Sequence, residues 1–404
     1  MGTFRLAWRN IWRHKRRTGI TLAALSLALV FTVLYGSMME GYMVNMEQGA
    51  LDFDIGGAQV FAPGYQDKPS IHTRMADAAD IVQRLEQQGI PAAARLLASG
   101  LVASGEASAG AQLRGIDLAR DTRVLSINTQ LKEGRWLDGA DPRGVVLGVK
   151  LARVLGVKLG DELVVLSQAT DGSIANELFT VRGVLLSVGE ATDRSGVFLT
   201  DQAFRELMSF DGGAHQVVVK RPVEMPLPVL AQRVMAAAPA RDVQTWRQLN
   251  PILATMMDSV RGMMAFIFFI VNIATAIVIL NAMLMAVFER IKEFGILKAL
   301  GAGATDVLKL IYAESLLQVV LAVGVALVVG TPALWYLSVY GVDMGALAGV
   351  SAMGLAMVSN WHAVVSVPGI LTPFLIMLVV VSVAVLYPAL KAALIQPVKA
   401  IHHT

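Results

Sequence analysis

The sequence predicts a polytopic α-helical membrane protein with four transmembrane helices and a large extracytoplasmic α+β domain between the first and second helices. Of the 404 residues, 55% are hydrophobic and only 16% are charged, a composition too apolar for an ordinary soluble protein. The apolar residues are concentrated in a few long blocks. One long region with frequent charges separates the first block from the others.

The first apolar block follows a strongly basic segment, residues 1–19, which contains no acidic residue. No charge occurs from Ile20 to Met39, and about 20 apolar residues span the hydrocarbon core of a bilayer. A cleavable signal peptide has the same polarity, but its apolar core is usually ~7–15 residues long. We therefore expect a retained transmembrane helix over 20–41, preceded by a basic amphipathic segment on the cytoplasmic surface.

The middle of the chain, residues 42–260, has the composition of a folded domain. No charge-free run in it reaches membrane length, and strand-like and helix-like patterns alternate. A region of this size can bury a hydrophobic core of its own, so we expect an α+β domain built from two subdomains. Because the preceding helix starts on the basic, cytoplasmic side, this domain is predicted to lie outside the membrane, in the periplasm.

Several elements of this domain have recognisable ends. The segment Val149–Leu155 has a helical pattern, and the glycines of LGVKLGD that follow predict a tight turn. Thr200 or Asp201 is a suitable N-cap for a helix that continues to Met208. The same patterns predict a helix over 76–88 and strands over 145–147, 162–166, 177–188, 196–199 and 217–220.

Three more apolar blocks in the last third of the chain predict further transmembrane helices. Four crossings put both termini on the cytoplasmic side, together with every basic cluster near a membrane end. The predicted helices are 261–288, 307–337 and 368–390, with a cytoplasmic segment at 289–306, a periplasmic loop at 338–367 and a cytoplasmic tail at 391–404.

The stretch Met344–Trp361 leaves an alternative open. It contains no charge but is rich in Gly, Ala and Ser, so its hydrophobicity is weak. A fifth crossing there would place Lys391 and Lys399 on the outer side, against the positive-inside rule. We interpret the stretch as an outer-surface or re-entrant loop, which is tolerated where protein or water surrounds the backbone.

The cytoplasmic segment between the second and third helices begins ERIKEFGILKALGAG. Its apolar residues recur every three or four positions, which predicts a short amphipathic helix on the inner membrane surface, ended by Gly301 and Gly303. The alternative is a tight, solvated connector between two transmembrane helices. The residues of the predicted apolar stripe are Ile291, Phe294, Leu297 (or Ile296) and Leu300.

Polar groups are scarce in the predicted membrane helices. Glu314 lies near the inner end of the third helix, and an intramembrane carboxylate is a candidate for function. The alternative is that Glu314 lies at the membrane interface and bonds to a neighbouring helix. Small residues four apart, Ala322 and Ala326, would allow close helix packing.

Motifs for catalysis and nucleotide binding are absent from the sequence. It contains no cysteine, no GxxxxGK[ST], no HExxH and no GxSxG, so we expect no P-loop, metal, cofactor or catalytic site in this chain. The net charge of only +3 does not indicate a nucleic-acid partner. We therefore expect a protein that is not itself an enzyme.

The order of elements and several motifs resemble one known family. A basic RNIWRHKRRT (Arg9–Thr18) precedes the first helix, EFGILKALGAG (Glu293–Gly303) separates the second and third, and YPALKAALIQPVKAI (Tyr387–Ile401) closes the chain. The segment Gly134–Leu166 is similar to a recurrent part of the family's periplasmic domain. Over essentially its full length, the chain resembles the FtsX-like permeases of the MacB and lipoprotein-releasing (Lol) type ABC transporters, the type VII family.

In that family, the loop between the second and third helices forms the coupling helix, which docks on the ATPase subunit. The family's usual Arg-Glu before Phe-Gly-Ile is Lys292-Glu293 here, which keeps the charge pattern. The resemblance implies that Phe294→Asp or Leu297→Asp uncouples transport while the protein stays folded. The implied coupling residues are Glu289, Arg290, Lys292, Glu293, Phe294, Gly295, Ile296, Leu297, Lys298, Ala299, Leu300 and Gly301.

The resemblance also implies partners and a location. The MacB exporter carries its ATPase at the N-terminus of the same chain, whereas this sequence starts at the first helix, so its layout is closer to that of the Lol-type permeases. We therefore expect a separate ABC ATPase dimer, which would bind ATP and Mg, and a second permease copy or a paralogue. The expected location is the bacterial inner membrane.

For the function, the resemblance implies mechanotransmission: ATP-driven closure of the ATPase moves the coupling helices, and the periplasmic domains open or close. The leading hypothesis is a permease that extracts lipoproteins or other lipidated cargo from the inner membrane, with or without a periplasmic chaperone. The alternatives are an efflux permease for drugs, peptides or glycolipids, working with a periplasmic adaptor, and a non-transporting signalling module.

Met and Phe residues cluster near the outer end of the second predicted membrane helix. Flexible Met side chains adapt to irregular apolar ligands, so this cluster would suit acyl chains. The alternative is ordinary lipid-facing and packing surface. The residues we expect to contact substrate or membrane lipid are Met256, Met263, Phe266 and Phe269.

Overall fold

The computed structural model describes residues 3–13, 15–222, 225–343, 351–352, 355–356 and 360–394. They fold into two units, which we call the helical unit and the α/β unit. Among the described residues, the helical unit comprises those up to 43, 257–343 and 360–394, and the α/β unit comprises 44–222, 225–256, 351–352 and 355–356.

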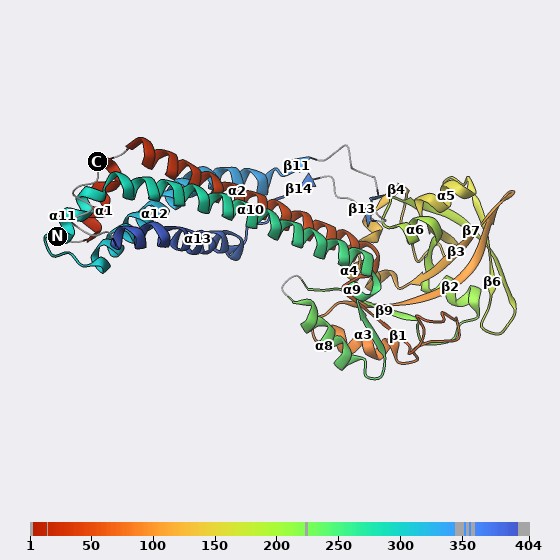
Figure 1. The fold of residues 1–404 in the computed structure, drawn as a ribbon. Helices are drawn as coiled ribbons and strands as arrows, with labels where there is room; N and C mark the ends of the chain where they lie inside the picture. The colour runs from red at the N-terminus through yellow and green to blue at the C-terminus, as the bar shows by residue number, and fades with distance from the viewer. Residues whose placement is uncertain are drawn as a thin grey trace. The chain divides into compact units, whose positions relative to one another are not determined.

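Four long helices, α2, α10, α12 and α13, run side by side in the helical unit, and the short helices α1 and α11 gather at one end of them (Figure 1). Within the described part of the chain, these four helices are long and apolar enough to cross a membrane. The bounds are α1 (Thr3–Arg13), α2 (Lys15–Ala50), α10 (Pro251–Glu289), α11 (Ile291–Ala299), α12 (Ala304–Val339) and α13 (Val367–Ala393).

The helices share one apolar core. Leu25 and Leu29 of α2 are buried in it with residues of α10, α12 and α13. The small residues Ala322 and Ala326 of α12 are also buried, and the Ser26 hydroxyl of α2 donates to the Ala322 carbonyl at 3.1 Å. Small side chains therefore let α2 and α12 approach closely, as the sequence predicts.

Helices α2 and α10 are longer than the apolar stretches that predict membrane spans over 20–41 and 261–288. Helix α2 runs from Lys15 to Ala50, and α10 begins at Pro251. Proline suits the first turn of a helix because the N–H it lacks would have no partner there. The length of an apolar stretch thus predicts the part of a helix that suits the membrane. The helix itself can extend further, to the residue at which it is capped or the backbone turns away.

Between α12 and α13 lies the segment for which we expect a periplasmic loop, 338–367. Most of 344–361 is outside the described residues, so the expectation of an outer-surface or re-entrant loop there stays a prediction. The described parts form two short antiparallel ladders, β11 (Val342–Asp343) with β14 (Asn360–Trp361) and β12 (Ser351–Ala352) with β13 (Leu355–Ala356).

A ten-stranded mixed sheet forms the framework of the α/β unit, with the order β10-β1-β9-β2-β3-β8-β5-β7-β4 and with β6 paired to β2 and β7. Most neighbouring strands are antiparallel, but β3 with β8 and β5 with β7 are parallel. The strands are β1 (Ala58–Phe61), β2 (Ala92–Ser104), β3 (Ala107–Ile116), β4 (Leu131–Gly134), β5 (Gly144–Leu147), β6 (Glu162–Gln168), β7 (Ile174–Leu185), β8 (Gly196–Thr200), β9 (Gln216–Val219) and β10 (Asp242–Thr245). The helical elements are η1 (a π-helix, Leu51–Ile55), α3 (Ala78–Gln87), α4 (Leu118–Val124), η2 (a 3₁₀ helix, Ile127–Thr129), α5 (Val149–Leu155), α6 (Glu190–Ser195), α7 (Asp201–Met208), α8 (Leu227–Ala237) and α9 (Trp246–Leu249).

Both faces of this sheet are covered. Val145 and Leu147 of β5 belong to a large core that also contains residues of α3, α5, α7 and α8. Val146, which lies between them, packs in a second cluster with Phe198 and Leu185. Successive strand residues point to opposite faces of the sheet. Because both faces are buried at β5, every residue of this strand is apolar in the sequence.

Several predicted elements of this unit are confirmed. Helix α5 spans Val149–Leu155, and Gly156 follows it in the left-handed conformation, with φ of 69°. The Thr200 hydroxyl caps α7 by accepting a hydrogen bond from the Ala203 N–H at 3.1 Å. One sheet contains all the strands from β1 to β10, and the division into two subdomains stays a prediction. Four membrane helices with one large α+β domain between the first two confirm the predicted fold class.

Candidate coupling site

Helix α11 is a separate element between two long membrane helices. The preceding helix, α10, ends at Glu289, and Arg290 leaves the helical conformation with φ of −114° and ψ of 17°. At the other end, Gly301 has φ of +98°, a conformation that glycine adopts without steric cost. The chain therefore bends before and after α11, so a short helix does separate the two long ones, over Ile291–Ala299; its place at the inner membrane surface stays a prediction.

The apolar residues of α11 divide into a buried and an exposed group. Ile291 and Phe294 are 8% and 1% exposed, and Phe294 belongs to the core of the helical unit. Ile296, Leu297 and Leu300 are 53%, 37% and 81% exposed. A single apolar stripe, as expected from the sequence, would have placed Phe294 and Leu297 together.

The position of Phe294 changes one expectation. An aspartate at a fully buried core position would disturb folding before it could report on coupling. Phe294→Asp is therefore not a clean uncoupling substitution, contrary to our expectation from the resemblance. Leu300 is 81% exposed and Leu297 only 37%, so Leu300 is the position at which a substitution tests docking with the least effect on the fold.

A buried ion pair connects α11 to the rest of the helical unit. The Arg290 guanidinium donates to both carboxylate oxygens of Glu314 on α12, at 2.8 and 3.0 Å. The two side chains are 8% and 10% exposed. Asn10 of α1 donates to the same carboxylate at 2.6 Å. Glu314, a carboxylate that the sequence singles out, thus bonds to two neighbouring segments near the end of its helix.

A second carboxylate extends this network. Glu293 of α11 accepts from Arg290 at 2.9 Å and from Arg13 of α1 at 2.6 Å. Partial burial opposes its charge, but Arg290 and then Arg13 more than compensate and lower the pKa of Glu293. Burial likewise opposes the charge of Arg290, and the two glutamates raise its pKa above the ordinary value. Both groups therefore stay ionised at neutral pH.

Further contacts fasten the ends of this site. Arg17 of α2 forms an ion pair with Glu289 at the end of α10. The Lys298 ammonium of α11 donates to the Ala393 carbonyl of α13 at 2.7 Å. Helices α2, α12 and α13 thus each have a polar contact with α11 or with the residues that flank it, and α10 directly precedes α11 in the chain.

The predicted coupling residues therefore differ in accessibility. Arg290, Phe294 and Gly295 are buried, whereas Glu293 and Lys298 are half-buried. The structure brings the charged members together in one network but leaves the coupling role of the set as a prediction. The exposed members are Glu289, Lys292, Ile296, Leu297, Ala299, Leu300 and Gly301.

The residues expected to contact lipid or substrate lie on α10. Met263, Phe266 and Phe269 are 54%, 62% and 61% exposed, and Met256 is half-buried. Large apolar side chains this exposed on a membrane helix suit contact with lipid. This geometry fits both acyl-chain contact and ordinary lipid-facing surface, so the specific role stays a prediction.

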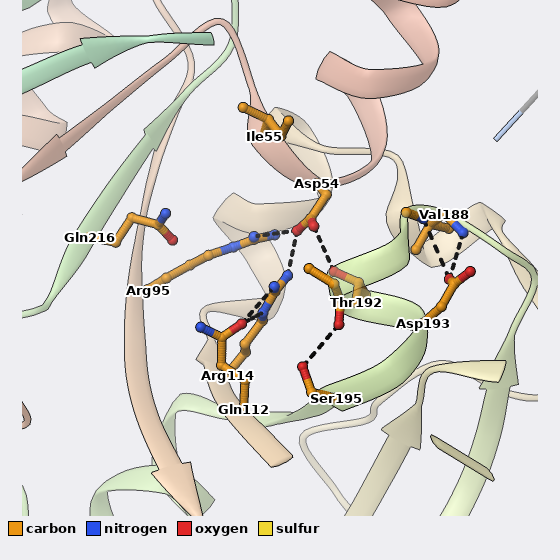
Figure 2. A network of polar contacts seen from close by, with 12 residues as sticks. Asp54, Ile55, Arg95, Gln112, Arg114, Val188, Thr192, Asp193, Ser195 and Gln216 are labelled. Carbon is orange, nitrogen blue, oxygen red and sulfur yellow. Dashed lines mark hydrogen bonds and ion pairs between the residues drawn. The ribbon is translucent and has the colours of Figure 1, made fainter. Parts of the chain in front are cut away.

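A second buried network lies in the α/β unit, where η1 follows α2 (Figure 2). Asp54 of η1 is the carboxylate toward which Arg95 of β2 and Arg114 of β3 both point. Arg114 forms a hydrogen-bonded ion pair with Asp54, and the Thr192 hydroxyl of α6 donates to it at 2.6 Å. The nearest Arg95 nitrogen is 3.9 Å from Asp54.

Arg95 has a second, closer carboxylate partner. It donates to both oxygens of Asp121 on α4 at 2.7 and 3.0 Å, and both side chains are 1% exposed. Burial opposes the guanidinium charge, but Asp121 and then Asp54 raise the pKa of Arg95. The network therefore ties η1 to two central strands and two helices. The sequence gives no signal for it beyond isolated charges in a strand-rich region.

Within the described residues, no group of three or more His, Asp or Glu residues is placed to hold a metal ion. The two networks around Arg95 and Arg290 are ion pairs of Arg with carboxylates, and such pairs hold backbone segments in place relative to one another.

Comparisons with known proteins identify the family. Residues 18–241, more than half of the chain, match the MacB-like periplasmic core domain. Residues 265–397 match the FtsX-like permease C-terminal domain. The chain belongs to the family of FtsX-like permeases with a MacB-like periplasmic core domain. The resemblance found in the sequence is thereby confirmed.

Individual relatives of this FtsX-like permease are distant. The lipoprotein-releasing system transmembrane protein LolC of Xylella fastidiosa is 23% identical over 97% of this chain and 96% of its own length. An uncharacterized ABC transporter permease of Methanocaldococcus jannaschii is 28% identical over 46% of each chain. The pyoverdine export ATP-binding/permease protein PvdT of Pseudomonas fluorescens is 23% identical over 98% of this chain, which spans 58% of PvdT. Among solved structures, the periplasmic region of MacB from Actinobacillus actinomycetemcomitans covers 54% of this chain with 16% identity and a TM-score of 0.37.

The family assignment defines the general role. This FtsX-like permease is an ABC transporter permease of the type VII family, and its four membrane helices and MacB-like domain fit a multi-pass inner-membrane protein. Permeases of this family are generally the non-catalytic components, so a partner ATPase is implied.

Proposed function

We propose that this permease couples ATP hydrolysis by a separate ATPase dimer to movement of its extracytoplasmic domain, with α11 as the coupling helix. The observation that supports this most strongly is the construction of α11. One side is anchored in the helical unit by Phe294 and by the Arg290–Glu314 pair. The other presents Ile296, Leu297 and Leu300 to the surroundings. A helix held firmly on one side and apolar on the other suits docking into a groove of a partner.

The contacts of the buried side of α11 determine which other helices a displacement of α11 would move. Arg290 and Glu293 connect α11 to α12 and α1 through Glu314 and Arg13. Several packed helices connected by charged hydrogen bonds move together more readily than a flexible loop would. Displacement of α11 by the ATPase is thus expected to tilt the helices as a group.

The far end of α2 offers a route into the extracytoplasmic domain. The chain passes from α2 through η1 to Asp54 without an intervening loop. Asp54 is bound by Arg114 and Thr192, which lie on β3 and α6. A tilt or rotation of α2 would therefore reach the sheet through these bonds. In this proposal ATP and Mg are bound by the ATPase, and both termini of the permease lie in the cytoplasm.

For the cargo, we propose lipoproteins or other lipidated molecules extracted from the inner membrane by a pair of permeases. The similarity to LolC over nearly the whole of both chains supports this cargo. The exposed Met263, Phe266 and Phe269 of α10 provide apolar surface for acyl chains. Efflux of a smaller amphiphile, with a periplasmic adaptor, is the second candidate because PvdT and MacB are also relatives.

ATP hydrolysis by the complex in lipid distinguishes these cargos. The permease would be purified with its cognate ATPase, reconstituted, and titrated with an acylated lipoprotein and with its unacylated form. Stimulation by the acylated form alone, with release of the lipoprotein into solution, is the expected result. A complex that hydrolyses ATP but responds to neither form would contradict lipoprotein extraction and favour efflux.

A further inference from the structure

A cavity of about 490 Å³ lies between α12 and α13 in the helical unit. This volume is within the range of small-molecule pockets, about 300–1,000 Å³. Its walls are mainly apolar and include Leu316, Val319, Leu378 and Val381. Leu316 and Leu378 are 41% and 37% exposed, so the cavity is open at the surface. Since both helices suit a membrane, this surface borders lipid.

The cavity also has a polar end. Lys309 of α12 lines it and is exposed. Among the described residues, no ion pair or hydrogen bond involves its ammonium group. Lys309 belongs to the first two turns of α12, which starts at Ala304 directly after α11. The basic end of the cavity is therefore the end nearest to α11 along the helix.

The distance between the polar end and the apolar walls fits a lipid. From Lys309 to Leu316 and Val319, α12 rises by roughly 10–15 Å, at about 1.5 Å per residue. A lysine at this depth extends its ammonium toward the membrane surface while its methylene groups stay among apolar atoms. The ammonium would thus lie at the level of phosphates, and the apolar walls at the level of acyl chains.

A hydrogen bond joins the two helices beside the cavity. The Tyr312 hydroxyl of α12 donates to the Ser382 carbonyl of α13 at 3.0 Å, and both residues line the cavity. The Ser382 hydroxyl is itself occupied by the Leu378 carbonyl at 2.7 Å. The polar groups of the walls are thus satisfied within the protein, and Lys309 is the group that remains for a ligand's charge.

We propose that this cavity binds one anionic phospholipid from the membrane leaflet next to α11, with the phosphate on Lys309 and an acyl chain along Leu316 and Val319. A bound lipid would fill the space between α12 and α13, the two helices that follow α11 in the chain. This inference rests on the membrane insertion of α12 and α13 and not on the cargo or the ATPase, so it can fail or hold independently of the proposed function.

Native mass spectrometry of the full chain tests the headgroup. The protein is incubated in detergent with equal, limiting amounts of phosphatidylglycerol and phosphatidylcholine and is then released from the detergent in the spectrometer. We expect it to retain at least three times as much phosphatidylglycerol as phosphatidylcholine. Lys309→Gln is expected to abolish that preference. Lys15→Gln, which removes the same charge from an exposed position of α2 outside the cavity, is expected to keep it. Equal preference in the protein and in Lys309→Gln would overturn the proposal.

A second variant tests the acyl chain. Leu316→Trp fills the cavity from a partly exposed position and is expected to reduce retention of both phospholipids. Because the chain contains no cysteine, Leu316→Cys provides a unique site for oxidative cross-linking in the membrane. Efficient cross-linking of two copies would show that a second chain covers the cavity and would overturn the proposal. A monomeric product, with lipid retention lost in Leu316→Trp, would support it.

Discussion

The molecule contains two buried arginine networks that use the same chemistry in different surroundings. In the α/β unit, Arg95 and Asp121 are both 1% exposed and hold β2 against α4. In the helical unit, Arg290 is 8% exposed, but its partner Glu293 is 38% exposed and also bonds to Arg13. The Arg95–Asp121 pair is closed to water, whereas the Arg290 network reaches from a buried pair to the surface beside α11.

This difference predicts a structural role for the first network and, under the proposed function, a coupling role for the second. Breaking a fully buried ion pair costs much free energy because water cannot solvate the charge that remains. In a network with one half-exposed member, water can solvate that member, so a change of ion-pair partners costs less free energy. We therefore expect the Arg95 network to keep its geometry during the transport cycle, and the Arg290 network to be the place where bonds rearrange.

The largest expected effect is on the buried pair of the α/β unit. Arg95→Met leaves the Asp121 carboxylate buried without its partner, and we expect it to destabilise the unit by about 3–5 kcal/mol. Thermal unfolding of the purified full-length protein measures the loss. The double variant Arg95→Met with Asp121→Leu removes both charges and is expected to recover most of the stability. No recovery in the double variant would contradict the view that the unpaired charge causes the loss.

A smaller loss of stability is expected in the helical unit. Arg290→Met should cost about 1–3 kcal/mol, because Asn10 still donates to Glu314 at the end of the bundle. Its effect on function should be larger than this cost suggests. We expect the complex with the ATPase to form, while cargo-stimulated ATP hydrolysis falls at least tenfold.

The double variant Arg290→Met with Glu314→Leu separates the two effects of that network. Removal of both charges is expected to restore stability, as in the α/β unit, but not the stimulation of hydrolysis. If the double variant recovered both its stability and the stimulation of ATP hydrolysis by cargo, the Arg290 network would have only a structural role. It would then not differ in role from the Arg95 network.

A still smaller effect is expected from acid. His215 in the α/β unit is fully buried; its Nδ1 accepts from the Leu97 N–H at 3.0 Å, and its Nε2 lies 2.9 Å from the Ile71 carbonyl oxygen. This arrangement requires a neutral ring with the proton on Nε2. Burial first, and then the charges of Arg74 and Arg205, lower the pKa of His215 below 6.5.

The sign of the pH dependence follows from this lowered pKa. As the pH falls below about 6.5, the unfolded chain binds a proton that folded His215 resists, so stability declines until the folded pKa is reached. We expect the melting temperature of the α/β unit to fall between pH 7 and pH 5. The His215→Gln variant should be less stable than the unaltered protein at pH 7, but its melting temperature should change less between pH 7 and pH 5. An equally steep change in the variant would contradict the view that His215 causes the pH dependence.

The smallest effect on stability is expected at the exposed side of α11. Leu300 is 81% exposed, and surface substitutions usually change stability by no more than about 0.5 kcal/mol. Leu300→Asp should therefore unfold like the unaltered protein. Val154→Asp on α5, where the replaced side chain is 64% exposed, is the matched control for adding a charge at an exposed helical position.

Local patterns in the sequence were sufficient for much of the fold. Charge-free length predicts the four membrane helices, and Thr200 and Gly156 mark helix ends because their effects act within one turn. The predicted spans are shorter than α2 and α10. Hydropathy indicates which residues suit the membrane, but it does not indicate where the backbone hydrogen bonds of a helix end. The existence of α11 is also predicted, since glycine and periodicity are local signals.

The contacts of the candidate site could not be predicted in the same way. Asp54 and Arg114 are far apart in the sequence, and only the sheet brings them together. Phe294 and Leu297 both suit an apolar stripe, so periodicity does not tell which one faces the core and which one faces a partner. The sequence draws attention to Glu314, but its partners Arg290 and Asn10 depend on how α1 and α12 pack.

The most direct test of α11 as the coupling helix is co-purification of the cognate ATPase with Leu300→Asp, compared with Val154→Asp and the unaltered protein. The proposed function predicts that Leu300→Asp keeps its fold and melting temperature but loses most of the bound ATPase, whereas Val154→Asp retains it. Retention of the ATPase by Leu300→Asp at the level of the control would contradict docking through the exposed side of α11.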